Sequence, residues 1–179
     1  MTYMSITTII RSLENQGLLL RYVPVRITGR AKRCLFMSPN MLSAYSNPNS
    51  AVNLLTGRGH IDAALTLWSA GDHIYDDGKL KAGPGFLKRL SGPPPEVWEI
   101  KVTNPTPQSR VFGRFCEPDT FVATGMFTRP FLGRKGSANW HSAMNQCVDE
   151  WSSLFVNHPP HVGSRLAEYV TENRDDFIL

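Results

Sequence analysis

The chain has 179 residues, of which 41% are hydrophobic, values that fit one medium domain or two small ones with a real core. No apolar run approaches the ~20 residues of a membrane-spanning helix, so we expect no membrane partner. The N-terminus lacks the basic, apolar and small-residue pattern of a signal peptide, which favours a cytoplasmic protein. Three widely spaced cysteines without zinc-site spacing favour neither disulfides nor a metal, and no motif indicates a cofactor.

The net charge of +4 is unevenly distributed along the chain. Residues 1–48 hold six cations and one acidic residue, Glu14, a net charge of +5, which leaves −1 for the rest. A basic segment joined to a nearly neutral domain predicts an anionic partner for the first and local positive charge on the second. The segment Asn40–Asn53 is rich in Ser, Asn and Pro and is predicted to be the linker between the two parts, 1–48 and 49–179.

The first part is predicted to form a helix followed by a β-hairpin. Apolar residues at helical spacing predict a helix over Ile6–Gln16, with Ser5 as its N-cap and Gly17 as its C-cap. Two apolar runs, 18–27 and 33–37, flank a basic turn and are predicted to pair with each other.

The second part is predicted to begin with two short helices. An apolar stripe predicts a helix over His60–Ala70 that ends at Gly71. Pro84–Leu90 is predicted to be another short helix in front of a run of prolines. The segment His73–Gly83 between them is predicted to be a loop.

Three strands and a long helix are predicted next. Val97–Val102 alternates apolar and charged residues, as does Arg110–Cys116, a pattern typical of strands with one covered face. Phe121–Phe127 has no charge, as expected of a central strand buried on both faces. Apolar residues at intervals of three and four predict the longest helix over Ala138–Phe155, and Leu166–Thr171 is predicted to be a final helical turn. The predicted fold is α+β, a small antiparallel sheet flanked by short N-terminal helices and one longer C-terminal helix, with the N-terminal helix and hairpin as an appendage.

Cations gather on or just beyond the predicted sheet. They are Lys101, Arg110, Arg114, Arg129, Arg134 and Lys135. Such a patch predicts contacts with phosphates, and the alternative is the ordinary solvated face of an antiparallel sheet. Trp98, Trp140 and Trp151 fall on apolar stripes and are predicted to lie in the core rather than to stack on bases.

The run IIRSLENQGLLLRYVPVRITGRAKRCLFMSP, within residues 1–39, resembles the recognition helix, basic wing and closing strand of a MarR-type winged helix. The resemblance implies contacts with DNA from the cations of this segment, which are Arg21, Arg26, Arg30, Lys32 and Arg33. Nothing precedes Thr2 to supply the helices that support a recognition helix. A truncated remnant, a segment packed on the second part and an ordinary helix-hairpin with a solvated basic face all remain open.

Three motifs follow one another in the second part: VWEIKV, SRVFGRF and FVATGMFTRPFLGRK. Their order after two short helices resembles the RelE/HigB toxin superfamily, in particular its phage-derived Gp49-like branch, over residues 55–155. The resemblance implies a toxin-type ribonuclease of a toxin–antitoxin system. Such a protein cleaves ribosome-bound mRNA without a metal, and a cognate antitoxin holds it silent.

Cleavage by a 2′-hydroxyl needs a general base, stabilisation of charge on the phosphorane and protonation of the leaving oxygen. Lys101, Arg110 and Arg129 match basic positions of the family, and His141 is the imidazole nearest to them in the sequence. The further residues assigned to nucleic-acid binding are Arg114, Arg134 and Lys135. Two alternatives stay open: a non-catalytic, DNA-associated regulatory module, and an inactive mobile-element relic.

Overall fold

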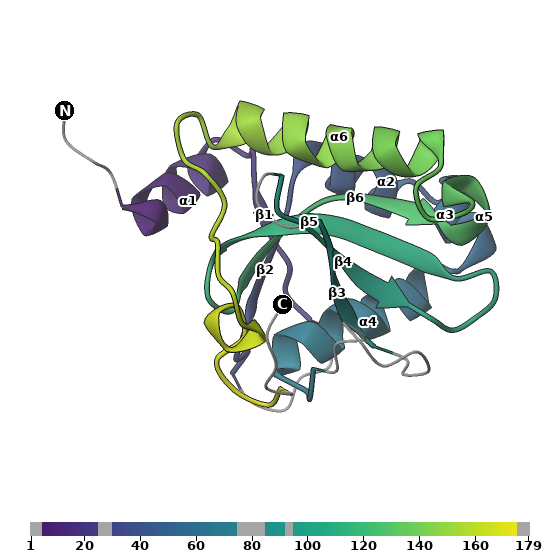
Figure 1. Ribbon diagram of the computed structural model, residues 1–179, viewed down its shortest axis with the longest axis horizontal. Helices are drawn as coiled ribbons and strands as arrows, with labels where there is room; N and C mark the ends of the chain where they lie inside the picture. Colours follow the sequence, from purple (N-terminus) through teal and green to yellow (C-terminus); the bar gives the residue numbers. More distant parts are fainter. Residues whose placement is uncertain (1–4, 25–29, 75–84, 92–94, 175–179) are drawn as a thin grey trace.

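A computed structural model describes residues 5–24, 30–74, 85–91 and 95–174 of the chain (Figure 1). The helices are α1 (Ile6–Asn15), α2 (Pro39–Ser46), α3 (Ala51–Leu55), α4 (Arg58–Ala70), α5 (Arg129–Leu132), α6 (Ala138–Leu154) and a 3₁₀ turn η1 (Leu166–Glu168). The strands are β1 (Leu20–Arg21), β2 (Cys34–Met37), β3 (Leu87–Ser91), β4 (Val97–Val102), β5 (Ser109–Glu117) and β6 (Thr120–Thr128).

The described strands form one sheet in the order β1-β2-β6-β5-β4-β3. β2 runs parallel to β6, and every other neighbouring pair is antiparallel. N-terminal helices and the longer helix α6 pack on this mostly antiparallel sheet, which confirms the predicted α+β class.

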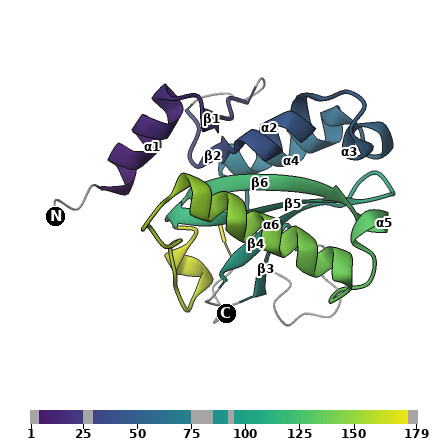
Figure 2. The same ribbon diagram turned by 90° about the horizontal axis from the view of Figure 1, so that it is seen from above.

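Helices cover both faces of the sheet, so the molecule has three layers (Figure 2). On one face, Leu65 and Trp68 of α4 lie in the same buried cluster as Phe115 of β5. On the opposite face, Trp140 of α6 packs with Phe112 of β5, their ring centroids 5.7 Å apart. Apart from the exposed edge strand β1, most strand residues are therefore buried or half-buried against one helical layer or the other.

The central strands are buried along almost their whole length. The prediction that Phe121–Phe127 is buried on both faces is confirmed in β6, where Phe127 alone of that run is partly exposed. The prediction of one covered face for Val97–Val102 is wrong, because all of β4 is buried. The charged residues of β4 face the layer that contains α6, which a period-two pattern alone does not reveal.

Two predicted segments have a different structure. The segment Asn40–Asn53, predicted to be a linker, contains most of α2 and the start of α3, and its Met41 is fully buried. Ser50 within this segment and Ser38 just before it start the two helices, since their hydroxyls each accept a backbone N–H of the following helix. The predicted helix Pro84–Leu90 is wrong in its described part, which enters strand β3 at Leu87 and pairs with β4.

Other local predictions are confirmed. Ser5 and Ser137 are the N-caps of α1 and α6, and Gly71 ends α4 in the left-handed conformation with a φ of 78°. The final helical turn is present as η1. Of the loop predicted over His73–Gly83, residues 75–83 lie outside the described part of the chain.

The N- and C-terminal parts of the described chain meet on the sheet. Arg33, at the start of β2, donates from Nη2 to the carbonyl of Glu172 at 2.6 Å. The hydroxyl of Tyr169 donates to Oε1 of Glu96 at 2.7 Å, and the amide of Asp119 donates to the carbonyl of Tyr169 at 2.8 Å. Residues 156–174, here called the C-terminal segment, are thereby held against the sheet by polar contacts that are largely buried.

Candidate functional site

The turn from β6 through α5 into α6 brings exposed cations beside an exposed aromatic ring. The side chain of Phe131 is 51% exposed and stacks on Phe127, with an interplanar angle of 15° and ring centroids 6.1 Å apart. Arg134 and Lys135 are exposed in the turn that follows α5, and Arg129 is partly exposed at its start. We call Arg129, Phe131, Arg134 and Lys135 the cationic corner.

Several hydrogen bonds fix the backbone of the cationic corner. The hydroxyl of Thr128 accepts the amide of Phe131 at 3.3 Å, and Nη1 of Arg129 donates to the carbonyl of Gly133. The Arg129 guanidinium also lies 5.0 Å from the ring centroid of Trp140. Ser137 joins the corner to α6, since its hydroxyl donates to the carbonyl of Leu132 at 2.6 Å and accepts the amide of Trp140. The cations therefore project from a well-supported turn.

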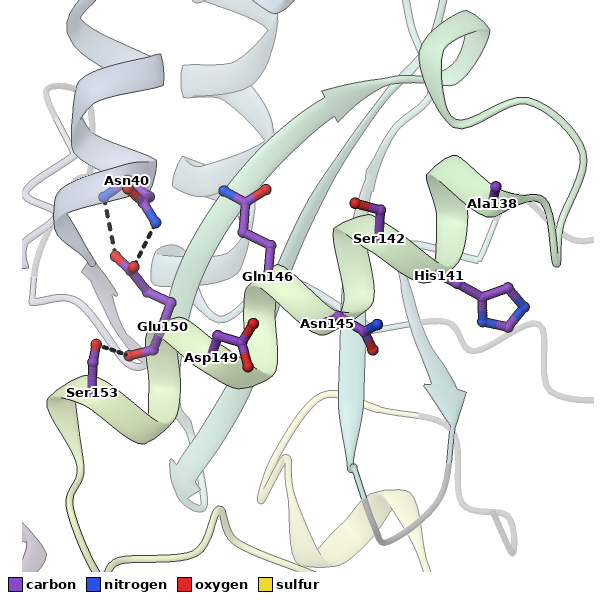
Figure 3. A pocket seen from close by; sticks show the side chains of 9 residues that line it. All are labelled: Asn40, Ala138, His141, Ser142, Asn145, Gln146, Asp149, Glu150 and Ser153. Atoms are coloured by element: carbon purple, nitrogen blue, oxygen red, sulfur yellow. Dashed lines mark hydrogen bonds between the residues drawn. The ribbon is translucent and has the colours of Figure 1, made fainter.

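A shallow groove of about 720 Å³ runs along α6 next to the cationic corner (Figure 3). Its lining residues are Asn40, Ala138, His141, Ser142, Asn145, Gln146, Asp149, Glu150 and Ser153. At one end Asn40 of α2 donates its backbone amide to Oε1 of Glu150 at 3.1 Å. His141 lies at the other end with its ring pointing away from that pair, so the groove holds no close pair of an acid and a base.

The sheet cations predicted for catalysis lie in the interior. Lys101 and Arg110 are direct cross-strand neighbours, and they are only 9% and 7% exposed. The Arg110 guanidinium forms an ion pair with Glu99, with Nε 3.2 Å from Oε2. It also donates to the carbonyl of Ser109 at 2.8 Å and to Oε1 of Gln108 at 2.9 Å. These contacts engage the guanidinium within the protein.

Arg114 and Arg33, both predicted to bind nucleic acid, are also buried. Arg114 is 5% exposed and donates to the carbonyls of Pro95 and Glu96, and Arg33 is 3% exposed with its Nε 3.6 Å from Oδ1 of Asp119. Burial lowers the pKa of both guanidinium groups below the ordinary value, because a desolvated cation is disfavoured.

The remaining N-terminal cations reach solvent at the other end of the sheet. Arg21, Arg30 and Lys32 are exposed, and Arg26 lies outside the described residues. Arg21 donates from Nη2 to the thiol sulfur of Cys34 at 3.1 Å. In Figure 1, α5 lies at the end of the molecule away from α1, and β1 lies nearer to α1, so these cations and the cationic corner form two separate groups.

Among the predicted site residues, the structure thus brings Arg129, Arg134, Lys135 and His141 together near the start of α6. Within the described ranges, no cluster of three or more His, Cys, Asp or Glu side chains is placed to hold a metal ion. The arrangement suits the binding of a polyanion, and the exposed side chain of His141 lies on the first turn of α6, which follows the corner in the chain.

The sequence analysis missed three residues that define the local chemistry. Glu99 was assigned to a solvated strand face, although its i+2 spacing from Lys101 places both on one face of β4. Glu96 has no sequence signal, because its partners Arg89, Trp98 and Tyr169 come from three parts of the fold. Phe131 occurs in the motif FVATGMFTRPFLGRK, which predicts no role for its ring.

Comparison with protein-family models, curated proteins and solved structures gave no match for this chain. None of the helices in the described residues is long and apolar enough to cross a membrane.

Proposed function

We propose that this protein binds single-stranded RNA at the cationic corner and acts as a toxin-type ribonuclease on ribosome-bound mRNA. The observation that carries the RNA-binding part is the exposed ring of Phe131 with Arg129, Arg134 and Lys135 beside it. Single-stranded nucleic acid is bound by this combination, because bases stack on an aromatic face while cations follow the phosphates.

The order of elements supports the more specific activity. A helix (α4), antiparallel strands β4–β6 and a long helix (α6) follow one another in the order of the RelE/HigB resemblance, although the second short helix of that order is replaced here by strand β3. Such a ribonuclease works in the cytoplasm, needs no metal and is silenced by an antitoxin partner. All three are parts of this proposal.

Within this proposal, His141 is the general base or acid and the cations of the corner stabilise the phosphorane. Lys135 and Arg134 are exposed to solvent, so a phosphate can reach their side chains. Arg110 and Lys101 are buried beneath the α6 layer, and Arg110 is neutralised by Glu99. We therefore assign them a supporting role, holding the strand that leads to the corner.

The experiment is cleavage of a labelled single-stranded RNA and of mRNA on translating ribosomes, with and without a chelator. His141→Ala should reduce the rate by about 10²-fold or more if the imidazole transfers a proton. His60→Ala is the matched control, because His60 is an exposed imidazole on α4. Equal rates for both variants would overturn catalysis by His141, and loss of activity with chelator would overturn metal independence.

A second candidate function is a non-catalytic nucleic-acid-binding module. The engagement of Arg110 in internal contacts favours it, because this guanidinium would otherwise clamp a phosphate during cleavage. In that case RNA binds the corner without being cut, or duplex DNA binds Arg21, Arg30 and Lys32. An inactive relic would bind neither.

A further inference from the structure

Three arginines are almost completely buried, and they differ in how their charge is compensated. Arg33 has Asp119 at 3.6 Å and Arg110 has Glu99 at 3.2 Å. Arg114 is 5% exposed and takes part in none of the ion pairs formed among residues 5–24, 30–74, 85–91 and 95–174. Burying a cation without a counter-ion costs free energy, so the buried position of Arg114 is unfavourable unless another group compensates its charge.

The contacts of Arg114 leave part of its guanidinium unused. Nε and Nη2 donate to the carbonyls of Glu96 and Pro95, and the guanidinium carbon lies 5.5 Å from the ring centroid of Trp151. Within the described part of the chain, Nη1 donates no hydrogen bond. An arginine stays charged at physiological pH, so the two N–H groups on Nη1 remain strong donors.

The acidic groups closest to Arg114 do not neutralise it. Burial raises the pKa of the Cys147 thiol to about 11, so this neighbour is uncharged at neutral pH. The Glu96 carboxylate accepts from Arg89, Trp98 and Tyr169, which belong to the core on the α4 side of the sheet. Its ion pair is with Arg89, and its charge raises the pKa of the Arg114 guanidinium by less than burial lowers it.

Arg114 lines a groove of about 580 Å³ at the C-terminal end of α6. The apolar part of the lining comes from Val148, Trp151, Phe155, Val156, Pro159 and Pro160. Ser152, Asn157 and His158 supply polar groups. The volume lies within the range of small-molecule sites, and an apolar lining with a few polar groups is their usual composition.

We propose that this groove binds a small organic anion, whose carboxylate or phosphate oxygen accepts from Arg114 and whose apolar body lies against Val156 and Pro159. The anion would supply a counter-charge for Arg114, which forms no ion pair with the described residues. One oxygen can accept from the unused Nη1, and the second N–H of Nη2, whose other N–H donates to the carbonyl of Pro95, can complete a bidentate contact. The site lies at the opposite end of α6 from the cationic corner and does not depend on RNA binding there.

Titration with benzoate and with phenyl phosphate, followed by the NMR signal of the Trp151 indole N–H, tests the site. This N–H donates to the carbonyl of His158 on the groove wall and reports its environment. Both probes should shift the signal in a saturable way. Benzyl alcohol, which has no charge, should bind much more weakly, and inorganic phosphate should also bind weakly because it lacks an apolar body.

Two neighbouring serines provide a matched pair of variants. Ser152 lines this groove, whereas Ser153 lines the groove of Figure 3, and both are exposed on α6. Ser152→Glu should weaken benzoate binding by at least about tenfold through like-charge repulsion, while Ser153→Glu should leave it nearly unchanged. Arg114→Met should abolish binding, with folding checked by the remaining NMR spectrum.

Each possible result either establishes or overturns the proposed anion site. Saturable binding of both anions that Ser152→Glu weakens and Ser153→Glu does not would establish the site, whatever the result of the RNA experiments. Equal effects of the two variants, equal binding of benzyl alcohol, or absence of a shift at millimolar probe would overturn it.

Discussion

Arg110 of β5 and Glu99 of β4 form an ion pair diagonally across the two strands, with Nε of the arginine 3.2 Å from Oε2 of the carboxylate. Their side chains are 9% and 4% exposed. The pair explains how a strand with alternating charges is accommodated inside the fold. It also means that Arg110 is held by the protein before any ligand arrives.

Removing one member of this pair should destabilise the fold strongly. Glu99→Ala or Arg110→Met should lower the free energy of unfolding by about 3–5 kcal/mol, because each removes one charge of a buried ion pair. The double variant Glu99→Leu/Arg110→Met should recover much of that loss. Urea unfolding measures all three, and additive losses in the double variant would contradict the assignment.

A surface ion pair serves as the control. Arg58 lies 3.9 Å from Asp62 on α4, and its side chain is 54% exposed. Arg58→Ala should change the free energy of unfolding by less than about 1 kcal/mol, because solvent screens exposed pairs.

Variants of the cationic corner should weaken RNA binding without weakening the fold. Phe131→Ala should reduce affinity for a single-stranded oligonucleotide by about 1–3 kcal/mol through lost stacking. Arg134→Ala/Lys135→Ala should lower the slope of log affinity against log salt by about 1.4, since each phosphate contact on a single strand contributes about 0.7. Fluorescence anisotropy at several salt concentrations gives both quantities.

The matched control for that double variant lies at the other end of the sheet. Arg30→Ala/Lys32→Ala removes the same charge from exposed positions and should leave the RNA slope unchanged. If this variant instead lowers affinity for duplex DNA alone, the winged-helix resemblance gains support. Deleting residues 1–48 would not be a usable test, because Leu35, Met37 and Met41 belong to the buried core.

Tyr22 should make stability depend on alkaline pH. Burial raises the pKa of its phenol from 10.0 to about 12, with smaller contributions from Thr66 and Asp62. A raised folded-state pKa means that the stabilisation is complete below pH 10 and is lost as the pH rises toward 12. The loss should be about 2–3 kcal/mol for this group. Urea unfolding between pH 8 and 12 should show a shallower decline for Tyr22→Phe than for the parent, and equal declines would contradict the assignment.

Tyr169→Phe should loosen the C-terminal segment. The hydroxyl of Tyr169 donates to Glu96 at 2.7 Å and accepts the amide of Gly163 at 2.6 Å, so its removal leaves a buried carboxylate short of one donor. We expect a loss of about 1–3 kcal/mol in the free energy of unfolding. Hydrogen exchange should speed up at the amides of Tyr169 and Val170, while those of β5 exchange no faster than the global change in stability requires.

Much of the local structure could be predicted from the sequence. Serines before apolar stripes located the starts of α1 and α6, and Gly71 located the end of α4, because capping depends on neighbouring residues alone. The uncharged run Phe121–Phe127 predicted a central strand, because a strand that is buried on both faces carries few charged residues. The candidate cations Arg134 and Lys135 followed from composition, since charged residues in a polar turn reach solvent.

The tertiary structure decided which charges are available to a ligand. Alternation along β4 and β5 placed Lys101, Arg110 and Arg114 correctly on one face, yet only the packing of α6 turned that face into an interior. The pairing of β2 with β6, which puts Arg33 beside Asp119, likewise joins residues far apart in the sequence. Periodicity reports the direction of a side chain relative to its own strand, whereas burial and ion pairing depend on what the rest of the chain brings to it.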